Sequence, residues 1–322
     1  MSWPAEVVAA DNPTTAAKAE LGRLLFYDPV LSSDGETACA TCHSEIWGMG
    51  DGLAKAVGVG GGLLTGPGRD GPAVGRRNAQ SLWNVAYRTT LFRDGRASTL
   101  EEQALMPMHD ERELAKAPDD VVADLRASDG YVARFAAAFP GEAEPVTVTT
   151  LTRALAAFQR TLTSRGASYD AYVAGDVGAL SEAAVEGMWR FAEAGCDSCH
   201  APPLFGSDGF YARGAGATPG EDGGRGEITG EAGDWGAFRV PSLRNARDTG
   251  PYFHDGSVED LEDAVRHELA RDAPGGEVDE ADVSAITTFL EKGLTDQSRA
   301  PARPDEVPSG LAVPKDGFRI PR

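Results

Sequence analysis

Apolar residues recur at helical spacing along much of the chain, and this pattern predicts a mostly α-helical fold. In residues 16–26 the leucines lie on one helical face. Ser181, with a glutamate directly after it, suits the N-terminal cap of a helix over residues 181–194. Further helices are predicted at residues 99–105, 119–127, 131–139, 149–163, 258–270 and 278–290. No alternating run is long enough to predict a substantial strand.

Two long glycine-rich segments, residues 46–79 and 201–240, separate the predicted helices. Loops of this length usually carry a function. The glycines do not indicate a dinucleotide site, because no predicted strand precedes them and no βαβ unit surrounds them.

Composition and charge narrow the class of protein. A chain of 322 residues fits about two domains. The net charge of −20 and the pI of about 4.6 argue against nucleic acid or an anionic membrane surface as the main partner. No apolar run approaches the roughly 18 residues of a membrane-spanning helix.

The four cysteines form two pairs of the same pattern, each followed directly by a histidine. The motifs are Cys39-Ala40-Thr41-Cys42-His43 and Cys196-Asp197-Ser198-Cys199-His200. Cys-x-x-Cys-His is the attachment motif of c-type haem, in which both thiols bind the porphyrin and the imidazole ligates the iron. A Cys₄ zinc site would place its pairs about 15–20 residues apart, whereas 154 positions separate Cys42 from Cys196. The sequence therefore predicts two covalently bound haem c groups, with His43 and His200 as iron ligands.

Two haem motifs imply two domains of similar plan, because each motif follows a predicted helix. We expect cytochrome c-like domains over residues 1–165 and 166–322, with the haems near the interface. Bacteria attach haem c outside the cytoplasm, so we expect a periplasmic protein. Residues 1–4 lack the basic and apolar regions of a signal peptide, and we expect the signal peptide to be absent from the sequence as printed.

Further short motifs resemble those of the bacterial di-haem cytochrome c peroxidases and their MauG-like relatives, over nearly the whole chain. Besides the haem motifs, they lie at residues 21–26, 77–79, 94–97, 100–104, 154–162, 240–245 and 251–256. The resemblance implies that the N-terminal haem reacts with peroxide and that the C-terminal haem transfers electrons. The resemblance is greatest to the MbnH-type branch, on residues 44–49 and the glycine-rich loop that follows them.

The resemblance also implies roles for individual residues. Glu113 matches the distal glutamate that moves the proton needed to split the O–O bond, and Gln103 lines the same pocket. A calcium ion lies between the haems in the family, and Asn78 matches one of its ligands. Thr249 and Pro251 match two more, through their backbone carbonyls. Oxygen donors of this kind suit a hard cation.

The N-terminal haem is predicted to be open on its distal side. Conventional di-haem peroxidases carry a distal histidine in the loop after the first haem motif, and residues 44–80 contain none. The single methionine of this loop, Met49, is too close to His43 to reach the opposite face. The iron would therefore be five-coordinate or water-bound without prior reduction.

Two further positions depart from the family pattern. The second haem's distal ligand, Met or Tyr in the family, lies fourteen residues after the position of His254, which is Glu268 here. Glu268 is the predicted ligand because it lies at the edge of an apolar helix face, and His267 is the alternative. The tryptophan that bridges the haems in the family is replaced by Arg93, and Trp83 is a candidate substitute or a core residue.

These features predict an enzyme that activates hydrogen peroxide at the open haem. Through a high-valent state of both haems, it would oxidise a Trp or Tyr side chain of a partner protein. One alternative is a conventional peroxidase that reduces peroxide with electrons from a small cytochrome or cupredoxin, and another is a di-haem electron carrier. Residues 255–282 contain eleven acidic residues against two arginines, typical of a solvated face or of a surface that docks a partner.

Overall fold

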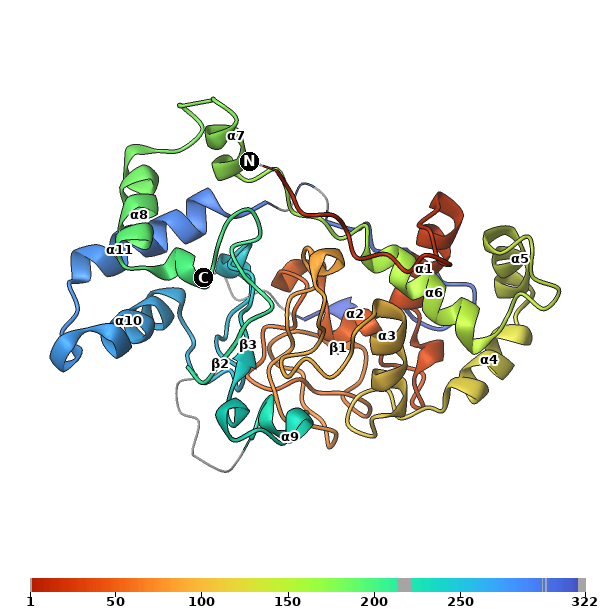
Figure 1. The fold of residues 1–322 in the computed structure, drawn as a ribbon. Helices are drawn as coiled ribbons and strands as arrows, with labels where there is room; N and C mark the ends of the chain where they lie inside the picture. Colours follow the sequence, from red (N-terminus) through yellow and green to blue (C-terminus); the bar gives the residue numbers. More distant parts are fainter. Residues whose placement is uncertain (1, 214–221, 297, 299, 318–322) are drawn as a thin grey trace. The chain divides into compact units, whose positions relative to one another are not determined.

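The computed structural model describes residues 2–213, 222–296, 298 and 300–317, and helices dominate it (Figure 1). The α-helices are α1 (Ala16–Tyr27), α2 (Cys39–Cys42), α3 (Leu100–His109), α4 (Pro118–Arg126), α5 (Asp129–Ala138), α6 (Val148–Gln159), α7 (Ser168–Val173), α8 (Glu182–Glu193), α9 (Gly226–Thr229), α10 (Leu261–Asp272) and α11 (Glu280–Thr288). The strands β1 (Leu64–Thr65), β2 (Phe210–Tyr211), β3 (Phe238–Arg239) and β4 (Lys315–Asp316) have two residues each. The predicted fold class, mostly helical without substantial strands, is confirmed.

The chain folds into two compact units, each with a haem motif. The N-terminal unit comprises the described residues of Glu6–Leu91, Ala97–Leu162 and Pro301–Arg322. The C-terminal unit comprises the described residues of Met1–Ala5, Phe92–Arg96 and Thr163–Ala300. Within the described residues, no helix is both long and apolar enough to cross a bilayer.

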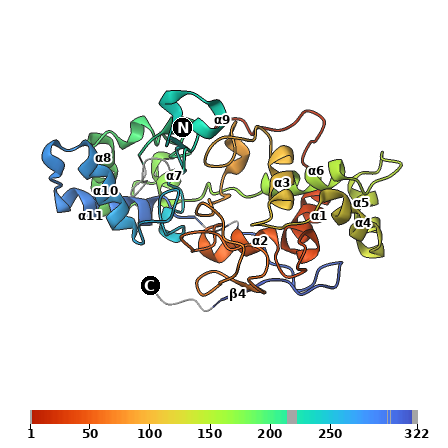
Figure 2. The same ribbon diagram turned by 90° about the horizontal axis from the view of Figure 1, so that it is seen from below.

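In the N-terminal unit, α1 packs along α6, as Figures 1 and 2 show from two directions. Gly22 of α1 lies so close to α6 that a Cβ atom there would be 2.0 Å from the carbonyl oxygen of Ala154. Only glycine permits this approach. Phe26 and Phe158 pack beside it with their ring centres 5.0 Å apart, so the two apolar faces form the core of this unit.

The C-terminal unit repeats this arrangement with α8 and α11. A Cβ atom on Gly187 of α8 would be 1.9 Å from the carbonyl oxygen of Ala285 in α11. Edge-to-face contacts join Phe191, Phe205 and Phe289 next to this crossing. Each haem motif therefore follows a helix that a glycine allows to cross a later helix closely, which accounts for the similar plan of the two units.

Each unit is built from several separate segments of the chain, unlike the predicted domains, which meet at a single boundary at residue 165. The main crossover does lie close by, after Leu162. The last segment, however, returns to the N-terminal unit, where β4 pairs in parallel with β1. Arg23 of α1 also donates a hydrogen bond of 2.7 Å to the carbonyl of Ala302. A contiguous boundary cannot represent such a return, because it depends on contacts between distant parts of the sequence.

Candidate haem sites and peroxide pocket

A cavity lies beside the first haem motif and collects the predicted residues of the peroxide site. Cys39, Cys42 and His43 line it together with Gln103 and Glu113. The remaining lining is largely apolar. Two thiols and an imidazole at one wall of an apolar cavity fit a covalently attached haem.

All four cysteines are only partly exposed, and three of their thiols have a raised pKa, which argues against a redox-active dithiol. Burial raises the pKa of Cys39 to about 12 and that of Cys42 well above its usual value. In the second motif, burial first and Glu268 next raise the pKa of Cys196 to about 11. A reactive cysteine needs a stabilised thiolate and hence a lowered pKa. All four cysteines are free of disulfides, as attachment of two haems requires.

Both motif histidines are oriented in the same way. The Nδ1 atom of His43 lies 3.0 Å from the carbonyl oxygen of Met49, and Nδ1 of His200 lies 3.1 Å from that of Phe205. A carbonyl oxygen only accepts, so this contact favours the neutral tautomer with the proton on Nδ1, in which Nε2 can bind iron. Met49 and Phe205 are buried and have positive φ angles of 63° and 50°. Such strained residues are typical of functional sites.

The chain reversal after α3 carries Glu113 back to the helix that bears Gln103. The N–H of Leu114 donates to the carbonyl of Pro107 at 3.0 Å. Gln103 and Pro107 are one helical turn apart and both line the cavity. The helix thus presents the amide of Gln103 to the cavity, and the reversal adds the carboxylate of Glu113.

The first glycine-rich loop packs on the backbone that carries Glu113. The N–H of Val59 donates to the carbonyl of Glu113 at 3.0 Å. A Cβ atom on Gly58 would be 2.1 Å from the carbonyl oxygen of Arg112, so glycine is required there. The glycine-rich composition serves close packing beside the peroxide pocket.

A buried arginine organises the same loop. Arg69 is 6% exposed, and its guanidinium donates to neutral acceptors. These are the carbonyls of Val57, Gly58, Gly62 and Leu64 and the hydroxyl of Thr37. Because Thr37 also lines the cavity, Arg69 ties the loop to the wall of the haem pocket.

Asp34, near the start of the first motif, is expected to make the protein sensitive to acid. Partial burial favours a higher pKa for Asp34, but hydrogen bonds from Glu36, Gly60 and other donors outweigh it and hold the pKa at about 2. An unfolded Asp titrates at about 3.9. The ionised Asp34 therefore stabilises the fold above pH ~4, and this stabilisation is lost as the pH falls toward 2.

The substitution Asp34→Asn tests this expectation in the haem-loaded protein. The free energy of unfolding, measured by urea titration between pH 2 and pH 7, should depend less on pH below pH ~4 than in the wild type. Asp119→Asn, which changes an exposed carboxylate of α4, is the matched control. If the free energy of unfolding falls equally with pH in the wild type and in Asp34→Asn, the ionised Asp34 does not stabilise the fold.

Gln159 is a cavity residue that the sequence analysis did not single out. It is the last residue of α6, is 5% exposed and lines the cavity. Leu155, one helical turn earlier, lines the cavity as well. The sequence therefore offered one signal for Gln159: a polar residue on the otherwise apolar face of its helix.

The two candidate ligands of the second haem have different surroundings. The Glu268 carboxylate accepts a hydrogen bond of 2.7 Å from Nε of Arg213, and the side chain of Glu268 is 37% exposed. Nε2 of His267 is buried and has no hydrogen-bond partner among the described residues. The ring of His267 meets that of Phe253 edge-on, with centres 5.0 Å apart. The carboxylate is therefore already paired, whereas the imidazole nitrogen is not.

The two bridging candidates belong to different units. Trp83 is 3% exposed in the core of the N-terminal unit, directly after Leu82, which lines the cavity. Arg93 belongs to the C-terminal unit, where its carbonyl accepts a hydrogen bond of 2.8 Å from the N–H of Arg239. A role for either residue in electron transfer stays a prediction.

The predicted calcium ligands are also divided between the units. Asn78 is buried in the N-terminal unit, and its Nδ2 atom donates to the carbonyl of Leu53 at 2.8 Å. Thr249 and Pro251 belong to the C-terminal unit. Across the part of the chain that the structure describes, no three His, Cys, Asp or Glu side chains form a metal-binding group. Calcium stays a prediction.

Comparison with known proteins assigns the family. The model of the family described as di-haem cytochrome c peroxidase matches residues 16–178. The methylamine utilization protein MauG of Methylorubrum extorquens is 40% identical over 80% of this chain and 69% of its own length. The cytochrome c551 peroxidase of Nitrosomonas europaea is 33% identical over 91% of this chain and 85% of its own length.

A solved structure supports the same assignment. A MauG-like protein associated with microbial copper homeostasis matches 92% of this chain and 94% of its own, with 31% identity and a TM-score of 0.80. The chain thus belongs to the di-haem cytochrome c peroxidase family. It is a haem peroxidase-type oxidoreductase with two haem c groups that acts on peroxide with a protein substrate or electron donor. The similar proteins include both MauG and cytochrome c peroxidases, so they do not identify the electron source.

Proposed function

We propose that this enzyme uses hydrogen peroxide to oxidise a Trp or Tyr side chain of a partner protein in the periplasm. The alternative is the conventional reduction of peroxide with electrons from a small cytochrome or cupredoxin. In both cases peroxide takes up two electrons and two protons to give two waters. In the proposed reaction both electrons come from the aromatic side chain of the partner.

One observation carries the proposal: the cavity beside the first haem motif is lined by a single histidine, His43. Within the part of the chain that the structure describes, its lining residues include no methionine or tyrosine and no second imidazole. This agrees with the absence of histidine from residues 44–80. No imidazole, thioether or phenol besides His43 is found among the described lining residues, so we expect peroxide to bind without prior reduction of the protein.

The polar groups of the cavity provide the proton chemistry. The bound haem supplies an iron that can accept peroxide as a ligand and take electrons from elsewhere. The carboxylate of Glu113 accepts a proton from one peroxide oxygen and delivers it to the other, as a general base and then a general acid. The amides of Gln103 and Gln159 can orient peroxide by hydrogen bonds but carry no transferable proton.

For the second haem we propose His267 as the distal ligand, in place of the sequence-based choice of Glu268. The buried and unpartnered Nε2 of His267 supports this choice, because a buried polar atom without a partner is costly. The Glu268 carboxylate, by contrast, is partly exposed and already has a counter-charge in Arg213. A nitrogen or oxygen ligand, unlike methionine, does not favour the reduced iron, which suits an enzyme that withdraws electrons from a protein.

The decisive experiment is the EPR spectrum of the ferric enzyme before and after one equivalent of peroxide. We expect a high-spin and a low-spin signal that both disappear within one turnover, without prior reduction. His109→Ala, which changes an exposed residue of α3, should respond like the wild type. Two low-spin signals that ignore peroxide even after prior reduction of the enzyme would contradict both catalytic functions. A need for prior reduction, together with rapid turnover of reduced cytochrome c, would support the conventional peroxidase.

A further inference from the structure

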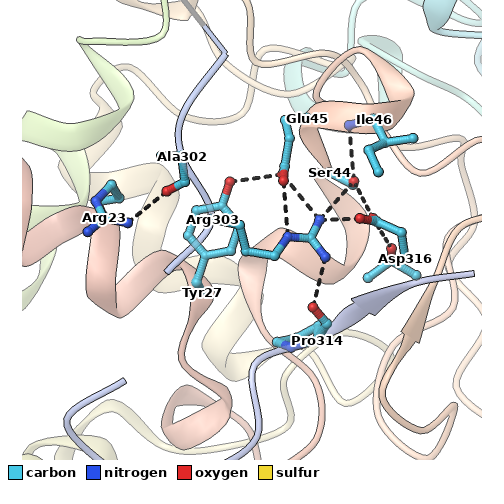
Figure 3. Close-up of polar contacts among 10 residues, drawn as sticks. Arg23, Tyr27, Ser44, Glu45, Ile46, Ala302, Arg303, Pro314 and Asp316 are labelled. Carbon is cyan, nitrogen blue, oxygen red and sulfur yellow. Dashed lines mark hydrogen bonds and ion pairs between the residues drawn. The ribbon is translucent and has the colours of Figure 1, made fainter. Parts of the chain in front are cut away.

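We propose that Arg303, in the returning C-terminal segment, is a positioning residue for the proximal histidine of the first haem. The inference depends on haem attachment at the first motif and not on the substrate of the enzyme. Arg303 lies 260 positions after His43 in the sequence. Figure 3 shows its guanidinium at the centre of a polar network beside the loop that follows His43.

The loop after the first motif forms a hydrogen-bonded turn that directs the carbonyl group of Met49 toward His43. The N–H of Ser44 donates to the carbonyl of Gly50 at 2.8 Å, and the N–H of Met49 donates to that of Ser44 at 2.8 Å. The carbonyl of Met49 then faces Nδ1 of His43 at 3.0 Å. Met49 has a positive φ of 63°, a strained conformation that the surrounding contacts must hold.

Arg303 contacts this turn through hydrogen bonds to the side chains of two neighbouring residues (Figure 3). Its Nε atom donates to Glu45 at 3.0 Å, and its Nη2 atom donates to Glu45 and to the hydroxyl of Ser44, both at 3.2 Å. The hydroxyl of Ser44 also accepts a hydrogen bond from the N–H of Ile46 at 3.2 Å. The guanidinium thus contacts the first two residues after the histidine.

The other side of the network ties Arg303 to its own segment and to α1. Nη1 donates to the carbonyl of Pro314 at 2.8 Å, and Nη2 donates to Asp316 at 2.8 Å. Asp316 in turn accepts hydrogen bonds from Ser44 and from Thr65. The hydroxyl of Tyr27, in α1, donates to Glu45 at 2.9 Å. The side chain of Arg303 is only 17% exposed, so these contacts are shielded from water.

The C-terminal unit contains a comparable arginine beside the turn after its haem motif. This repetition indicates that the arginine contacts serve haem binding and not only the attachment of the C-terminal segment. Arg244 donates from Nε to the carbonyl of Pro203 at 2.6 Å and pairs with both oxygens of Asp170. Pro203 lies between His200 and Phe205, whose carbonyl orients that histidine. In both units a shielded arginine therefore holds the turn that fixes the proximal imidazole.

The contacts of Arg303 should affect the electronic state of the first haem. A carbonyl that accepts the Nδ1 proton makes the imidazole a stronger donor, which stabilises the ferric iron. If Arg303 is lost, the turn can relax and the Met49 carbonyl can move away from His43. The reduction potential of the first haem would then become more positive, and its reaction with peroxide would slow.

The test compares Arg303→Gln with Ser309→Ala in the haem-loaded full chain. For Arg303→Gln we expect a changed high-spin EPR signal, a more positive potential of the first haem and a roughly tenfold slower reaction with peroxide. Arg303→Lys should give the same changes in EPR signal, potential and rate, because one ammonium group cannot replace the three donating nitrogens of the guanidinium. Ser309 anchors the same segment to Asp28 at 2.7 Å without touching the turn, so Ser309→Ala should change stability alone.

If Arg303→Gln fails to fold, Ser44→Ala provides the same readouts. It removes only the hydroxyl that accepts from Arg303 and donates to Asp316. It should shift the potential in the same direction by a smaller amount. An EPR signal and a potential equal to those of the wild type in the folded Arg303 variant would overturn the proposal, whatever the loss of stability. Equal shifts in Ser309→Ala would overturn it too, because they would show a general effect of loosening the tail.

Discussion

Replacing Glu113 by glutamine is expected to slow the reaction with peroxide by about 100- to 10,000-fold, the usual contribution of a general acid–base group. Glutamine keeps the size of the side chain and one acceptor oxygen but cannot transfer the proton. The cavity, the glycine-rich loop and the helix that carries Gln103 should therefore remain in place. Stopped-flow absorbance at the haem bands, with the ferric enzyme in excess over peroxide, measures the bimolecular rate constant.

Glu111→Gln is the matched control, because this exposed glutamate lies two residues earlier in the same reversal of the chain. Its rate constant should equal that of the wild type. Gln103→Ala should have a smaller effect than Glu113→Gln, since it removes an orienting amide and no proton carrier. A Glu113→Gln enzyme that reacts with peroxide at the wild-type rate would exclude Glu113 as the proton carrier.

The sequence could predict those parts of the fold that depend on local patterns. The helices α1 and α8 follow from apolar spacing, and the haem motifs follow from five-residue signatures. The role of Gly22 and Gly187 could not be predicted, because it depends on which helix crosses each glycine. Only the structure shows that the two glycines occupy equivalent crossings before the two motifs.

The sequence could not predict features that require distant segments to meet. Nothing near Arg303 in the sequence indicates a haem, and its contacts with Ser44 and Glu45 arise from the return of the chain. The predicted role of Glu268 likewise depends on contacts that the sequence does not contain. A helical wheel places it at the edge of an apolar face but cannot show that Arg213 supplies its counter-charge.

His267→Ala is expected to convert the second haem from low spin to high spin, if its Nε2 atom is the distal ligand. Alanine preserves the helix, because it is the best helix former, and it leaves a space where the imidazole was. The low-spin EPR signal of the ferric enzyme should disappear, and a second high-spin signal should replace it. Added imidazole should restore the low-spin signal by occupying that space.

The matched variant, Glu268→Gln, separates the two candidate ligands. It removes the ion pair with Arg213 at a partly exposed position, where such pairs contribute about 0–1 kcal/mol, so the low-spin signal should persist. The reverse result, loss of the signal in Glu268→Gln and its retention in His267→Ala, would assign the iron to the carboxylate.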